Sequence, residues 1–241
     1  NYRFAMEVMN FWRVFTNSLL LSVVVATLQL ASSTLVGYGL ARFEFRGRNL
    51  ILAAAIFTLV VPPQMMMVPL YLNWRFFNIY GLLPGQGLNL LNSPWPFILT
   101  AITGTGLRNG LFILVMRQFF TGIPRSLEEA AYVDGAGPLR TFIQVMLPSA
   151  VPSMVVVFLF GFVWQWNDSF LTTLYLDHNF LPVALSNITT RLAQYFEMTD
   201  PQYFSLMVNA GSMLMIAPLL IMYTVLQRYF VESIERTGLV G

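Results

Sequence analysis

The stretch Phe15–Ala41 reads FTNSLLLSVVVATLQLASSTLVGYGLA and contains no charged side chain. A helix needs about 20 mostly apolar residues to cross roughly 30 Å of hydrocarbon. Within lipid the backbone amides have to be paired with each other, which a helix achieves within one segment. The stretch therefore predicts a membrane-spanning helix.

Four further stretches have the same length and character: Leu50–Leu72, Trp95–Met116, Ala150–Thr172 and Phe204–Gln227. The chain as a whole is 56% apolar and 10% charged, whereas soluble domains are about half apolar and a quarter charged. No tandem repeat or flexible linker separates the stretches. We predict one all-α domain over residues 1–241, a polytopic membrane helical bundle with five visible spans.

Arginine placement predicts the orientation, because short cytoplasmic loops retain basic residues. The first loop, the third loop and the tail hold Arg42, Arg46, Arg48, Arg117, Arg125, Arg140, Arg228 and Arg236. The opposite side holds Arg3, Arg13, Arg75 and Arg191. We expect a cytoplasmic C-terminus, an N-terminal stretch on the outer side and a sixth span upstream of Asn1.

Small residues at Ser33 and Gly37, and at Gly106 and Gly110, have the spacing of close helix contacts in membranes. The contacts predicted are either within this bundle or with a second subunit.

Composition also excludes several functions. Without cysteine there is no disulfide, thiolate metal site or cysteine nucleophile. Without lysine there is no phosphate-binding loop of the ATPase type. The net charge of +2 is too small and dispersed to suggest a nucleic-acid partner. Motifs of serine hydrolases and zinc proteases are missing too. We expect no catalytic residue, metal or cofactor on this chain.

The segment 117–148 is the longest polar interruption and predicts two short helices. Ser126 and Glu129 have the spacing of a capping box, which predicts a helix beginning at Leu127. Gly135 suits a left-handed C-cap, and Pro138 suits the first turn of the next helix. From spacing alone, a docking element for a partner and a plain interfacial helix both remain open.

The run Glu129-Ala130-Ala131 is followed after three residues by Gly135 and, after nine intervening residues, by Val145-Met146-Leu147-Pro148. This pattern resembles the EAA loop of ABC importer permeases, with Val145 where that family has isoleucine. Nearly the whole chain from Asn17 resembles the carbohydrate-uptake branch, through Arg117-Gln118-Phe119-Phe120, Ile123-Pro124, Asp134-Gly135, Trp166-Asn167-Asp168 and Gln227-Arg228-Tyr229-Phe230.

The resemblance implies a cytoplasmic coupling helix that sits in a cleft of an ATPase subunit. Residues expected to couple to the ATPase are Ser126, Glu128, Glu129, Ala130, Ala131, Asp134, Gly135, Leu147 and Pro148. The implied partners are two ABC ATPase subunits carrying ATP and magnesium, a second permease subunit, an extracellular solute-binding protein and membrane lipid. The implied location is a bacterial or archaeal inner membrane.

Candidate residues for the solute path are Arg108, Asn109, Trp164, Trp166, Asn167 and Asp168. An arginine within a span needs a partner or water, so Arg108 either contacts solute or pairs with an acid such as Asp168. The tryptophans and their polar neighbours suit sugar contact, but the interpretation as an interfacial belt or helix packing is favoured.

A secondary transporter is disfavoured because no acid lies at midplane depth in the predicted spans. An ABC permease for amino acids, peptides or another solute shares the same coupling loop and remains the alternative. We therefore expect an ATP-driven importer permease for sugars or oligosaccharides that works by alternating access.

Overall fold

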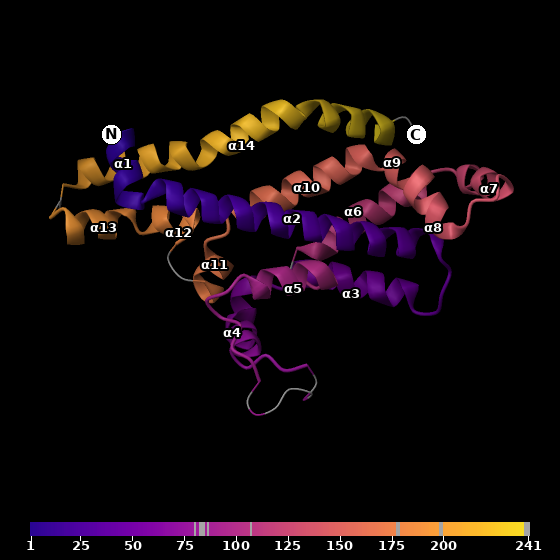
Figure 1. Ribbon diagram of the computed structural model, residues 1–241, viewed down its shortest axis with the longest axis horizontal. Helices are drawn as coiled ribbons and strands as arrows, with labels where there is room; N and C mark the ends of the chain where they lie inside the picture. Colours follow the sequence, from indigo (N-terminus) through magenta and orange to yellow (C-terminus); the bar gives the residue numbers. More distant parts are fainter. Residues whose placement is uncertain are drawn as a thin grey trace. The chain divides into compact units, whose positions relative to one another are not determined.

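The computed structural model describes residues 1–79, 81, 85, 87–106, 108–176, 179–197 and 200–238, although not the side chains of residues 195 and 228–238. The described residues form helices, turns and one isolated bridge between Phe77 and Leu88 (Figure 1). The predicted all-α class is confirmed for this part of the chain.

The chain divides into two compact units, which are described separately. The first comprises Asn1–Val25, Gln64–Ile98 and Phe162–Val225. The second comprises Ala26–Pro63, Leu99–Gly161 and Leu226–Gly241. Four helices contribute residues to both units: α2 (Phe11–Arg42), α5 (Trp95–Thr103), α10 (Val151–Trp166) and α14 (Pro201–Gly238).

The first unit also contains α1 (Tyr2–Met9), α4 (Met67–Arg75), α11 (Phe170–Tyr175), α12 (Leu181–Ser186) and α13 (Ile188–Tyr195). Its core forms where apolar residues of α12 and α13 pack against α1. Gly211 of α14 lies against this core, since a Cβ there would come within 2.7 Å of Leu185 and 3.1 Å of Met9. The absence of a side chain at Gly211 thus allows close packing.

The second unit contains α3 (Arg48–Val60), α6 (Asn109–Gly122), α7 (Arg125–Val133), α8 (Pro138–Thr141), a π-helical turn η2 (Phe142–Met146) and α9 (Leu147–Ser149). The 3-10 turn η1 (Pro63–Met66) begins in this unit and continues into the first. Glycines position its helices. A Cβ on Gly110 would collide with the backbone carbonyl of Ala55 in α3, and one on Gly37 would come within 2.7 Å of Met116 in α6. These two small-residue contacts therefore lie within the chain.

Two helices are long and apolar enough to cross a membrane, Phe11–Arg42 and Pro201–Gln227. Two further spans are obtained if each bent pair is counted as one: Arg48–Val60 with Pro63–Arg75, bent by 98°, and Pro138–Ser149 with Val151–Trp166, bent by 74°. The predicted count of five spans is not confirmed. The structure therefore provides two to four candidate spans in the described residues.

The prediction of one continuous helix over Trp95–Met116 is wrong. Helix α5 ends at Thr103 and α6 begins at Asn109. Gly104 adopts φ +68, a left-handed conformation that a right-handed helix does not continue through. Gly106 lies in this break and faces the side chain of Asn109, so it makes none of the predicted helix–helix contact.

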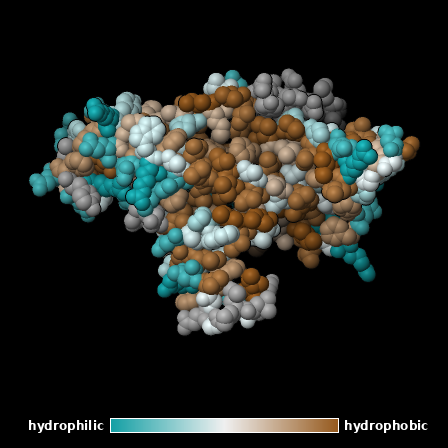
Figure 2. Space-filling view, in the orientation of Figure 1, coloured by the Kyte–Doolittle hydropathy of each residue, from teal (hydrophilic) through white to brown (hydrophobic). Residues whose placement is uncertain are grey.

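Surface chemistry in the second unit differs between α3 and α7. Helix α3 has no buried residue, and its large apolar side chains Leu50, Phe57 and Val60 are exposed. Figure 2 shows apolar side chains over α3 and hydrophilic ones around α7. Exposed apolar helix surface is expected where a chain faces lipid or another subunit.

Candidate functional site

Helix α7 forms the body of the predicted loop and begins earlier than the sequence suggested. Its N-cap is Pro124, its first residue is Arg125, and no side chain caps it. The predicted capping box of Ser126 and Glu129, with a start at Leu127, is therefore wrong. Pro124 has φ −57 and its carbonyl accepts the N–H of Leu127 at 3.3 Å, so the first turn forms before Ser126 can act as a cap.

The end of α7 agrees with the prediction. Gly135 has φ +80, and its N–H donates to the carbonyl of Tyr132 at 3.0 Å. The N–H of Ala136 donates to the carbonyl of Ala131 at 2.9 Å. This left-handed cap closes the helix, and α8 then begins at Pro138 as predicted. No atom lies within 4 Å of a Cβ built on Gly135. Within this chain, glycine is therefore favoured at this position by the backbone conformation and not by a lack of space.

The two faces of α7 differ in exposure. Glu128 and Ala131, one turn apart, are buried. Glu129, Ala130 and Val133 are exposed, Val133 at 87%. The predicted coupling residues therefore divide between a face that is anchored to the chain and a face that is available to a partner.

Glu128 is anchored by two residues of α2. The hydroxyl of Tyr38 donates to Oε1 of Glu128 at 2.8 Å, and Nε of Arg42 lies 3.1 Å from Oε2 in an ion pair. Nη2 of Arg42 also donates to the carbonyl of Ile123 at 2.8 Å. The Arg42 and Glu128 side chains are only 7% and 10% exposed. Arg42 thus joins the end of α2 to both the end of α6 and the body of α7.

Aromatic packing surrounds this anchor. The ring centroid of Tyr38 lies 4.7 Å from that of Phe142 in η2 and 5.3 Å from that of Phe120 in α6. Tyr38 and Arg42 were not identified from the sequence as partners of the loop. Their four-residue spacing places them on one face of a helix, and this was the sequence pattern that could have indicated a shared contact. The spacing does not indicate that Glu128 is the partner.

A hollow of about 210 Å³ lies beside the anchor, and Arg42, Arg125, Glu128, Glu129 and Tyr132 are among its lining residues. Arg125 forms an exposed ion pair with Glu44 at 3.5 Å.

The remaining coupling candidates lie at element boundaries in the same unit. Asp134 is the exposed C-cap of α7. Leu147, half-buried, and Pro148, exposed, form α9 directly after the π-helical turn. Their expected role in coupling stays a prediction.

Asn109 of the predicted solute path is fully buried in the second unit. Its Nδ2 donates to Oγ of Ser32 at 3.4 Å, and its Oδ1 accepts from Nε2 of Gln29 at 3.3 Å. The Ser32 hydroxyl donates to the carbonyl of Ala101 at 2.6 Å. A polar cluster therefore connects α2, α5 and α6. Gln29 and Ser32 are missing from the predicted set, although polar residues inside an apolar stretch were the signal.

Arg108 lies in the same unit, half-buried at the N-cap of α6. Asp168 belongs to the other unit. The alternative in which these two residues pair stays a prediction.

The other solute-path candidates lie in the first unit. Trp166 is fully buried, donates its indole N–H to the carbonyl of Met215 at 3.0 Å and stacks on Phe162. Asp168 is nearly buried and accepts the N–H and hydroxyl of Thr172 at 3.0 and 3.3 Å, which secures the first turn of α11. These contacts are structural, and solute contact by either residue stays a prediction.

Asn167 is exposed and donates to the carbonyl of Val163 at 2.8 Å, while Trp164 is half-buried. Within the described part of the chain no three His, Cys, Asp or Glu residues are grouped so that they could hold a metal.

Comparison with known proteins gives consistent matches. Residues 33–236 match the family described as binding-protein-dependent transport system inner membrane component. The diacetylchitobiose uptake system permease protein NgcG of Streptomyces coelicolor is 32% identical over 244 residues, covering 98% of this chain and 72% of that protein. The arabinooligosaccharides transport system permease protein AraQ of Halalkalibacterium halodurans is 28% identical over 234 residues, covering 96% and 75%.

The fold is also similar to a solved structure. A chain in the crystal structure of a bacterial ABC transporter involved in the import of the acidic polysaccharide alginate has a TM-score of 0.70 and 23% sequence identity. The match covers 95% of this chain and 78% of that one.

Proposed function

The chain belongs to the family of binding-protein-dependent transport system inner membrane components, and from this we propose that it is a permease subunit of an ATP-driven sugar or oligosaccharide importer. Its partners are two ABC ATPase subunits, a second permease subunit and an extracellular solute-binding protein. ATP and magnesium bind to the ATPases and not to this chain. The C-terminus and α7 face the cytoplasm.

The observation that carries the proposal is the division of α7 into an anchored and an exposed face. The Glu128 carboxylate, the Tyr38 hydroxyl and the Arg42 guanidinium hold the inner face. Separating a buried ion pair leaves two unpaired charges, which costs several kcal/mol, roughly 3–5 for the loss of one partner. A force applied to α7 is therefore transmitted to the ends of α2 and α6 rather than absorbed by bending of the loop.

The exposed face has the chemistry of a docking surface. Leu127, Tyr132, Val133 and Leu139 are exposed large apolar or aromatic residues, and Val133 and Leu139 are the most exposed of these four. Exposed apolar patches mark sites of protein contact. The small side chain of Ala130 permits close approach of a partner. An ATPase cleft that covers this face would bury Val133 and Leu139, and the closing of the ATPase pair on ATP would then displace α7.

Transport follows from coupling two states to nucleotide binding. ATP favours the closed ATPase pair, and the closed pair contacts α7 differently from the open pair. This difference favours one arrangement of the spanning helices over the other. The loaded binding protein docks on the outer side, the path opens to receive solute, and hydrolysis by the partner ATPases resets the permease.

Sugar cargo is supported by the two relatives described above, whose names give diacetylchitobiose and arabinooligosaccharides. Saccharides present many hydroxyl groups, and the buried Asn109 and Ser32 form a neutral polar cluster with the half-buried Gln29 in the second unit. Arg108 and Asn109 remain our candidates for solute contact there, as do Trp164, Trp166, Asn167 and Asp168 in the first unit.

The decisive experiment is solute-stimulated ATP hydrolysis by the complete complex reconstituted in lipid. Ala130→Arg places a charged, bulky side chain on the exposed face of α7, and we expect it to reduce stimulation and uptake at least tenfold while the permease pair still assembles. Asn49→Arg is the matched control, because it adds the same charge at an exposed position outside α7. Full stimulation in Ala130→Arg would reject the coupling role of α7.

Cargo is tested separately by uptake of labelled solutes into the same vesicles. Disaccharides and oligosaccharides are compared with amino acids and dipeptides, with ATP omitted as the control. Uptake of saccharides alone supports the proposal. Uptake of amino acids or peptides alone would leave the ABC permease assignment intact and replace the cargo.

A further inference from the structure

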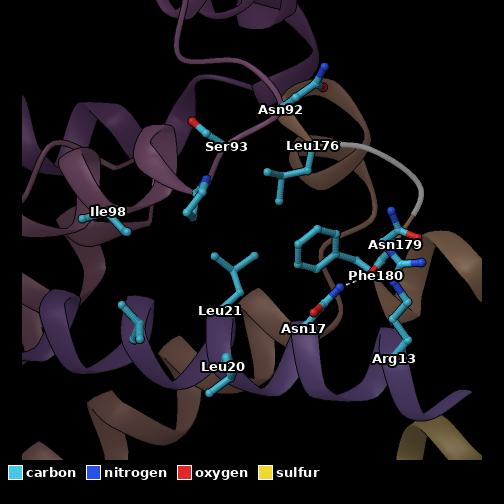
Figure 3. A pocket seen from close by; sticks show the side chains of 12 residues that line it. Arg13, Asn17, Leu20, Leu21, Asn92, Ser93, Ile98, Leu176, Asn179 and Phe180 are labelled. Carbon is cyan, nitrogen blue, oxygen red and sulfur yellow. Dashed lines mark hydrogen bonds between the residues drawn. The ribbon is translucent and has the colours of Figure 1, made fainter.

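A groove of about 450 Å³ opens in the first unit, outside the coupling site. Its walls are the first turns of α2, the segment that leads into α5, and Leu176, Asn179 and Phe180 from between α11 and α12 (Figure 3). All of its lining residues belong to this one unit. Nothing in the proposed coupling mechanism uses it.

The groove changes from polar to apolar along α2. Arg13, Asn17, Leu21 and Val24 line it from one helix, at spacings that keep side chains on one face. Eleven residues separate Arg13 from Val24, about 16 Å at 1.5 Å per residue. Figure 3 shows Arg13 and Asn17 at one end and Leu21 nearer to Ile98 at the other. The groove therefore matches an elongated molecule with one polar end.

Among the residues that the structure describes, the positive charge at the polar end of the groove has no acidic partner. The guanidinium of Arg13 is exposed and makes no hydrogen bond or ion pair with any residue that the structure describes. Among the described lining residues there is no acid. The amide of Asn17 is already engaged, donating to the carbonyl of Asn179 at 3.0 Å. An anionic group is thus the complement of this end, and guanidinium binds phosphate oxygens in bidentate geometry.

Two exposed tryptophans indicate where the polar end of the groove lies relative to the membrane. Trp12 adjoins Arg13, and Trp95 adjoins the lining residue Pro94. Tryptophan side chains prefer the level of the lipid headgroups. Helix α2 is long and apolar enough to cross the membrane, so its course from Arg13 to Val24 runs from headgroup level into hydrocarbon.

We propose that this groove binds one anionic phospholipid, with the phosphate on Arg13 and an acyl chain along Leu21, Val24 and Ile98. A saccharide would find no hydrogen-bonding side chain on the α2 wall of the apolar half, where Leu20, Leu21 and Val24 line the groove. A free phosphate would leave that half unoccupied. The polarity gradient and the charge are together matched by a molecule with an anionic head and a hydrocarbon tail.

Native mass spectrometry of the purified complex measures the binding. The complex is delipidated and titrated with phosphatidylglycerol, with phosphatidylcholine of the same acyl chains, and with glycerol phosphate as the head alone. We expect selective retention of phosphatidylglycerol. Arg13→Gln should lower its occupancy at least fivefold, Arg13→Lys should lower it less, and Leu21→Trp, which fills the apolar half, should also lower it.

Arg3→Gln on α1 is the matched control, since it removes the same charge from an exposed residue that does not line the groove. Each variant is first checked for an unchanged melting temperature. If Leu21→Trp fails that check, the exposed Arg13 variants decide the question.

Three results would overturn the proposal. Equal retention of both lipids, with no effect of Arg13→Gln, would reject headgroup recognition. Displacement of phosphatidylglycerol by glycerol phosphate would show that the groove is an anion site. Displacement by an oligosaccharide would show that it is a solute site. Loss of the second permease from Leu21→Trp, at an unchanged melting temperature, would make it a subunit interface.

Discussion

Glu128 and Arg42 form an ion pair from which most solvent is excluded. Such a pair contributes little net stability compared with apolar residues of the same shape, because both charges were desolvated on folding. Removing one partner has a much larger effect, since the other charge stays buried and unpaired. The pair therefore matters because it holds together the ends of α2 and α6 and the body of α7.

We predict that Glu128→Ala lowers the free energy of unfolding by about 3–5 kcal/mol. The measurement is denaturant unfolding of the purified protein in detergent. Glu129→Ala is the control, because this adjacent carboxylate is exposed and its removal should change stability by less than about 0.5 kcal/mol. Equal losses in the two variants would show that the buried pair does not anchor α7.

The contact of α3 with α6 depends on the missing side chain of Gly110. A Cβ there would collide with the backbone carbonyl of Ala55, and a backbone atom cannot rotate away as the tip of a side chain does. We predict that Gly110→Ala destabilises the protein by about 1–3 kcal/mol through forced separation of the two helices. Thermal unfolding in detergent measures the change.

Gly39 in α2 provides the comparison, since no atom lies within 4 Å of a Cβ built on it. Gly39→Ala should stabilise the protein by about 0.5–1 kcal/mol, because alanine is the better residue in a helix interior. If both substitutions acted in the same direction, helix propensity rather than the α3–α6 contact would govern the result.

Some of the helix boundaries could be predicted from the sequence and others could not. The left-handed cap at Gly135 and the start of α8 at Pro138 follow from local backbone chemistry, and both were predictable. The start of α7 was misplaced because a capping box and a proline N-cap compete over the same few residues. The glycines around Arg108 permit a kink, but glycine is common in membrane helices, so only the backbone conformation of Gly104 shows that the helix ends there.

For the molecule as a whole, apolar length and the loop motif were sufficient to predict the class and the family. The Tyr38–Glu128 anchor was beyond reach, because its residues are 90 positions apart and no local rule connects them. The groove beside Arg13 was beyond reach for the same reason, since three distant segments form it.

Orientation is testable because the chain has no cysteine, so that each introduced thiol is the only one. We predict that Val133→Cys reacts with a membrane-impermeant maleimide only when the reagent reaches the cytoplasmic side. Asn89→Cys, in the loop predicted to lie outside, should react in intact cells. The unmodified chain serves as the blank. Labelling of both positions from the same side would reject the predicted topology, and exchange of the two sides would reverse the orientation.

The π-helical turn at Phe142–Met146 gives the chain tolerance to a change of length. Such a turn accommodates one residue more than an α-helical turn does. Loss of one residue here would produce an ordinary α-helical turn and leave α8 and α9 facing as before. The same deletion inside α10 would rotate every later side chain of that helix by about 100°. Between Gly135 and Pro148, the π-helical turn is therefore a place where the length of the chain can change without altering how α8 and α9 face.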